Sequence, residues 1–86
     1  MKRSHRDIIY DMLKITLNKN NRIRKTQLMS KANMSHKQLT NYLNELFKNR
    51  MISFSEDGKY ISVFEPRGFR YINEYERFMK YLNEQD

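Results

Sequence analysis

The side chains best suited to chemistry in this sequence are amides and cations spaced along one segment. Lys37, Asn41, Asn44 and Lys48 recur every three or four residues, so on a helix they share one side. Asn can bind adenine through two hydrogen bonds, and Lys can reach guanine. A solvated helix face is the alternative, but Asn is a poor helix former. Two outward Asn residues therefore favour contact with DNA.

Residues beside this row extend the predicted DNA contact. Ser35 and His36 begin the segment, where a helix offers free N–H groups to a phosphate, and Thr40 can touch a thymine methyl. The predicted DNA-binding set is Arg24, Lys25, Ser35, His36, Lys37, Thr40, Asn41, Asn44, Lys48 and Lys59. Further cations that suit phosphate are Lys2, Arg3, Arg6, Arg22 and Lys31.

The charge distribution supports a polyanionic partner. The 86 residues contain 17 Lys and Arg against 10 Asp and Glu, a net charge of +7. Residues 1–50 carry 12 of these cations and 3 acids, a net of +9, whereas residues 51–86 carry 5 cations and 7 acids, a net of −2. We therefore expect the contact surface in the first half.

Enzymatic chemistry finds little support in the residues. The two histidines, His5 and His36, fall on different predicted elements, and Cys is absent, so a zinc site lacks ligands. No Gly-rich phosphate loop or nucleophile elbow is present. We predict no enzyme activity, no metal or other cofactor, and no small-molecule ligand, because a cavity of about 300 Å³ would consume much of so small a core.

Periodicity and capping signals predict the elements that position these residues. Apolar spacing predicts helices over about 5–17, 35–50 and 66–83, with Ser4 and Ser35 as N-caps. Thr26 is predicted to be the N-cap of a short helix through about residue 32, after a basic, extended link at 22–25. Asp57-Gly58 predicts a two-residue hairpin turn. Such a turn pairs Phe54 with Ile61 and Ile52 with Val63.

The order of helix, helix, turn, helix and hairpin is that of a helix-turn-helix followed by a wing. The wing tip carries Glu56 and Asp57, which repel phosphate. We therefore expect the wing to contribute little, or to touch the DNA backbone through Lys59 alone.

With these elements in this order, the sequence resembles the archaeal winged helix-turn-helix proteins, whose small members include dimeric chromosomal DNA-binding proteins with a C-terminal coiled coil. The matching stretches are Lys25-Thr26-Gln27-Leu28-Met29, Ala32-Asn33-Met34-Ser35, Leu39-Thr40-Asn41-Tyr42-Leu43-Asn44-Glu45-Leu46, Phe64-Glu65-Pro66-Arg67-Gly68 and Tyr71-Ile72-Asn73-Glu74-Tyr75. Glu65 stands where that family usually has a Thr cap.

The last helix is too long for the domain to cover. Eighteen residues span about 27 Å, and we expect its apolar side to pair with a second copy. The predicted dimerisation residues are Ile72, Tyr75, Phe78, Met79 and Leu82. The alternative is packing of this helix against the first helix of the same chain.

We thus predict a mainly α fold with a small β-hairpin, comprising a winged helix-turn-helix DNA-binding domain at 1–65 and a C-terminal antiparallel dimerisation helix at 66–86. The predicted function is a cytoplasmic homodimer that binds double-stranded DNA as a transcriptional regulator, with no membrane segment. The alternatives are a non-specific chromosomal architectural protein and a winged-helix adaptor for an acidic protein. RNA binding stays open.

Overall fold

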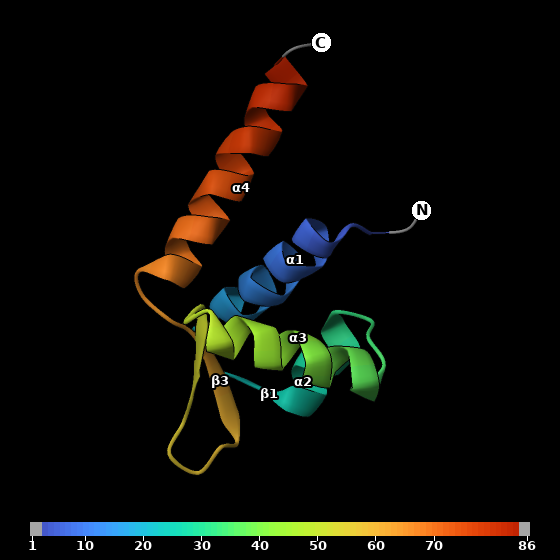
Figure 1. The fold of residues 1–86 in the computed structure, drawn as a ribbon, viewed down its shortest axis with the longest axis vertical. Helices are drawn as coiled ribbons and strands as arrows, with labels where there is room; N and C mark the ends of the chain where they lie inside the picture. The colour runs from blue at the N-terminus through green and yellow to red at the C-terminus, as the bar shows by residue number, and fades with distance from the viewer. Residues whose placement is uncertain (1–2, 85–86) are drawn as a thin grey trace.

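The computed structural model describes residues 3–84, which form four helices and a three-stranded sheet. In chain order these are α1 (His5–Asn18), β1 (Ile23–Arg24), α2 (Lys25–Lys31), α3 (His36–Lys48), β2 (Ile52–Phe54), β3 (Tyr60–Val63) and α4 (Arg67–Glu84). Figure 1 shows α1, α2 and α3 gathered beside the sheet, while the C-terminal part of α4 projects away from them. The predicted winged helix-turn-helix architecture is confirmed, and the C-terminal helix is present.

Two of the predicted helix caps are confirmed, and one is wrong. The Ser4 and Ser35 hydroxyls accept hydrogen bonds of 3.1 Å from the backbone N–H groups of Asp7 and Gln38. The predicted cap Thr26 instead lies inside α2, which begins at Lys25. The chain enters α2 directly from β1, with Arg24 at the N-cap, and the Gln27 side chain accepts the Arg24 N–H at 3.1 Å.

The sheet is antiparallel, in the order β1-β3-β2. The predicted register is confirmed, because Phe54 pairs with Ile61 and Ile52 with Val63. The basic link predicted as extended is a true edge strand, in which Ile23 pairs with Ile61. Both Ile23 and Ile61 are fully buried, so β1 closes the sheet over the core.

The turn of the hairpin differs from the predicted two-residue Asp57-Gly58 turn. The Gly58 N–H donates to the Ser55 carbonyl at 2.8 Å, so Glu56 and Asp57 are the central residues. Gly58 follows them with φ +73°, a left-handed conformation that glycine adopts at little cost. The Ser55 hydroxyl also donates to the Asp57 carboxylate at 2.6 Å, which favours this wider loop.

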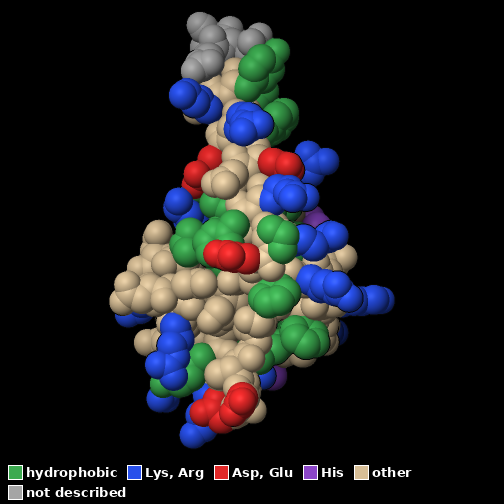
Figure 2. All heavy atoms as spheres, turned by 90° about the vertical axis from the view of Figure 1, so that its left-hand side faces the viewer, with side chains coloured by type: hydrophobic (Ala, Val, Ile, Leu, Met, Phe, Trp, Pro, Cys, Tyr) green, Lys and Arg blue, Asp and Glu red, His purple; other side chains and the backbone are tan. Residues whose placement is uncertain are grey.

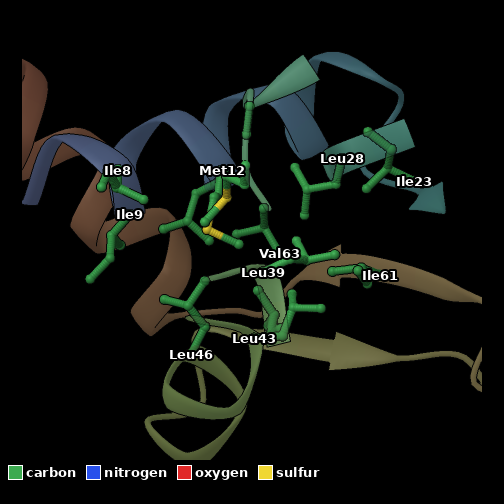
Figure 3. Packing of buried hydrophobic residues seen from close by; sticks show 14 of the residues in the cluster. Ile8, Ile9, Met12, Ile23, Leu28, Leu39, Leu43, Leu46, Ile61 and Val63 are labelled. Carbon is green, nitrogen blue, oxygen red and sulfur yellow. The ribbon is translucent and has the colours of Figure 1, made fainter. Parts of the chain in front are cut away.

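The core lies between α1, α2, α3 and the inner face of the sheet. Figure 3 shows side chains from these elements converging on one cluster. Its buried hydrophobic members are Ile8, Ile9, Met12, Leu13, Ile23, Leu28, Ala32, Met34, Leu39, Leu43, Leu46, Ile52, Ile61, Val63 and Ile72. This cluster fixes the angle at which α3 presents its outer side.

The first half of α4 packs on its own chain, as the alternative interpretation proposed. Ile72 is only 3% exposed and belongs to the core, so its assignment to the dimerisation face is wrong. The Tyr75 ring stacks on the Tyr10 ring at 4.1 Å between centroids, and Lys14 pairs with Glu76 at 2.9 Å. Beyond these contacts α4 leaves the domain.

Candidate nucleic-acid interface

α3 has one buried side and one exposed polar side. Leu39, Leu43 and Leu46 are buried against the core. The predicted row of Lys37, Asn41, Asn44 and Lys48 lies exposed, as do His36 and Thr40. Ser35 is committed to capping the helix through its hydroxyl. The result is a helix whose solvent side offers amides and ammonium groups.

Four of the predicted residues meet in a hollow between α3, the start of α2 and β2. The hollow has a volume of about 330 Å³. The predicted residues in its wall are Lys25, His36, Thr40 and Asn44, and the remainder of the lining is Thr26, Met29, Leu39, Leu43 and Phe54. The Lys25 ammonium lies 5.6 Å from the centre of the Phe54 ring, a cation–π distance. Lys37, Asn41 and Lys48 do not line this hollow.

A second basic cluster lies on the outer face of the sheet. Because Ile23 and Ile61 point into the core, Arg22, Arg24 and Tyr60 fall on the opposite face. The Arg22 guanidinium lies 3.7 Å from the centre of the Tyr60 ring, and Arg24 donates two hydrogen bonds, of 3.0 and 3.3 Å, to the Tyr60 hydroxyl. These bonds lower the pKa of Tyr60.

Sequence reasoning treated Arg22 only as a general phosphate candidate and missed Tyr60. The alternation around Ile23 is a signal that Arg22 and Arg24 share one face. Within residues 3–84, neither guanidinium makes an ion pair with a carboxylate. Both groups therefore keep free N–H donors, although Tyr60 already holds them in place.

The tip of the hairpin is acidic. Glu56 and Asp57 are exposed there, and Figure 2 shows acidic side chains gathered at the bottom of the molecule, over this tip. The Asp57 carboxylate accepts the Ser55 hydroxyl and the Lys59 backbone N–H, and these bonds lower the pKa of Asp57. The tip stays negatively charged, while Lys59 beside it is exposed.

The one acid of α3 is engaged by α1. The Glu45 carboxylate lies 2.8 Å from His5 Nε2, and the Tyr42 hydroxyl lies 3.1 Å from His5 Nδ1. Arg3 is similarly occupied, since it bonds Asp11 and the Ala32 carbonyl. Arg3 is therefore less suited to phosphate than the sequence suggested, and Lys2 lies outside the described residues.

Other kinds of site receive no support. Among residues 3–84, no group of three or more His, Cys, Asp and Glu side chains could hold a metal ion. No helix in this range is long and apolar enough to cross a membrane.

Comparisons with known proteins agree with this architecture. The chain is similar to F93 from STIV, a winged-helix DNA-binding protein, with a TM-score of 0.74 and 22% identity over 91% of this chain and 92% of that one. It is also similar to Sso10a-2, a DNA-binding protein from Sulfolobus solfataricus, with a TM-score of 0.75 and 22% identity over 96% of this chain and 85% of that one. Comparison with curated protein sequences gives no match. Residues 2–83 match the family described as winged helix-turn-helix, and the chain belongs to that family.

Proposed function

We propose that this protein binds double-stranded DNA by placing α3 in the major groove. The observation that carries the proposal is the exposed side of α3. Its polar side chains face solvent, while the one acid of the helix, Glu45, is paired with His5; these exposed side chains are Lys37, Asn41, Asn44 and Lys48. These residue types match the donors and acceptors on base edges. Both similar structures are described as DNA-binding proteins, which supports the same role here.

Phosphate contacts come from the cations around this helix. Lys25 at the rim of the hollow is exposed, and so are Arg22 and Arg24 on the outer face of the sheet. Such contacts supply most of the affinity and little sequence discrimination. Because Glu56 and Asp57 make the hairpin tip acidic, the outer face of the sheet suits a phosphate backbone better than the tip does.

A gel shift with duplex DNA across a salt series tests the proposal. We expect binding at low salt and a log–log slope of about 0.9 for each neutralised phosphate. Lys37→Ala with Asn41→Ala should weaken binding, whereas the matched pair Lys80→Ala with Asn73→Ala, exposed on α4, should not. No shift at low salt would contradict DNA binding and favour an adaptor for an acidic protein.

We further propose that the chain is a homodimer joined through α4, with residues 66–86 as the dimerisation segment and 1–65 as the DNA-binding domain. Beyond Glu76, α4 exposes large apolar side chains, with Phe78 52% and Tyr81 57% exposed and Met79 and Leu82 beside them. Apolar side chains are visible near the upper end of the molecule in Figure 2. Tyr81 is an addition to the sequence-based set.

If two α4 helices pair in antiparallel orientation, their C-terminal ends point in opposite directions. The resulting dimer then carries two α3 helices. A groove of about 380 Å³ beside Phe78 and Met79 gives room for a partner side chain. Light scattering at micromolar concentration should give twice the mass of the 10.6 kDa chain. A strictly monomeric mass would contradict the dimer and leave the DNA proposal standing.

We also propose that the protein acts as a transcriptional regulator, which is a narrower claim than DNA binding alone. A regulator prefers its own site over unrelated duplex, whereas an architectural protein does not. Competition with unrelated duplex DNA therefore separates the two, and equal competition would favour the architectural role. The same competition with duplex RNA tests which nucleic acid is bound.

A further inference from the structure

The hollow beside α3 has an apolar floor, although it lies within a basic and polar face. Half-buried Met29 and Phe54 form this floor, with Leu39 and Leu43 behind them. The polar side chains of the lining are all exposed, whereas the apolar ones are half-buried or buried; the polar members are Lys25, Thr26, His36, Thr40 and Asn44. A surface built only for phosphates and base edges has no need of such a floor.

Thr40 adds to the apolar character of the wall. Its hydroxyl donates to the His36 carbonyl at 3.0 Å, so this donor is already used within the helix. Thr40 lines the hollow, and its methyl group is the part of the side chain left for a ligand. Together with the half-buried Met29 and Phe54, this methyl group makes the bottom of the hollow suited to an apolar group.

Duplex DNA presents one apolar group in the major groove, the C5-methyl of thymine, among base edges that are otherwise hydrogen-bonding. Lys25 at the rim attracts the strand that carries the base. We infer that the hollow receives a thymine methyl group, with Asn44 beside it to bond an adenine edge. This inference rests on the proposed DNA binding and names the base that the hollow selects.

The test compares two duplexes of one sequence, one with thymine and one with deoxyuridine at every such position. The exchange removes only methyl groups and leaves every phosphate and base-pairing edge in place. We expect the deoxyuridine duplex to bind about fourfold more weakly for each methyl group received, with an unchanged salt slope.

Variants locate the effect. Met29→Gln makes the floor polar and should abolish the preference, and Thr40→Ser should reduce it while keeping the hydroxyl that bonds His36. Lys37→Ala, which lies outside the hollow, should weaken both duplexes equally. Thermal melting verifies that each variant is folded. If Met29→Gln does not fold, Thr40→Ser alone provides the test.

Three results would overturn the inference. Equal affinity of the wild type for both duplexes contradicts it and leaves DNA binding intact. A preference that is undiminished in every folded hollow variant shows that the methyl group is sensed elsewhere. Absence of any shift with the thymine duplex at low salt overturns the proposed function and this inference together.

Discussion

Replacing both arginines that contact Tyr60 tests whether the outer face of the sheet holds DNA phosphates. Arg22→Ala with Arg24→Ala lowers the net charge of the chain from +7 to +5. Both side chains are exposed and make no ion pair with a carboxylate within residues 3–84, so their removal breaks no salt bridge there. The fold should persist because Ile23, the buried residue between them, is unchanged.

The expected magnitude follows from counterion release. If each guanidinium neutralises one phosphate, the log–log salt slope falls by about 1.8. Between about 50 and about 200 mM salt, wild-type affinity then drops about 12-fold further than that of the variant. Tyr60→Phe complements this result, because it removes the hydroxyl that holds Arg24 but keeps both charges. It should lower affinity without changing the slope.

Fluorescence anisotropy with a labelled duplex measures both quantities. Arg67→Ala with Arg70→Ala is the matched control, since it removes two exposed cations from α4. A slope for the Arg22 and Arg24 variant equal to that of wild type would refute the reasoning. An equal fall in the control would also refute it, because the effect would then reflect net charge alone.

Three further predictions concern α4. Phe78→Glu with Leu82→Glu places charges in the exposed apolar face of α4 and should halve the mass measured by light scattering. Circular dichroism should show that the variant is still folded, and an unchanged mass would contradict this dimer face. Gly68→Ala should lower the free energy of unfolding by about 1–3 kcal/mol in urea denaturation, since an added Cβ would lie 2.5 Å from the Met51 carbonyl oxygen; an unchanged midpoint would contradict that contact. The hydrogen bond from the Tyr75 hydroxyl to the Asp7 carboxylate raises the pKa of Tyr75 from 10.0 to about 12. The stabilising effect of this hydrogen bond is therefore complete below pH 10 and is lost as pH rises toward about 12. Urea denaturation across that range should show a smaller loss in Tyr75→Phe than in wild type, the remainder coming from Tyr10, whose pKa is also raised to about 12; an equal loss in both would contradict the contribution of Tyr75.

Local signals in the sequence were enough for the elements and for most of their ends. Ser35 and Gln38 form a reciprocal cap that depends only on neighbouring residues. The hairpin register followed from alternation, because one shift would turn Ile52 and Ile61 outward. The turn itself was predicted wrongly, since side-chain bonding of Ser55 competes with the two-residue alternative.

Contacts between distant segments needed the tertiary structure. The two residues of β1 form a strand only because β3, almost 40 positions later, supplies the partner groups. That pairing also brings Tyr60 to Arg22 and Arg24, which no local pattern indicates.

The sequence by itself determined the polar side of α3, because helical spacing and burial of the leucines dictate which residues face outward. It also determined the basic character of the first half of the chain. Only the tertiary structure decided that α2 and β2 enclose a hollow against α3, and that α4 buries Ile72 yet exposes Phe78. Both outcomes depend on where packed elements end relative to one another, and that is a property of the assembled core rather than of any one segment.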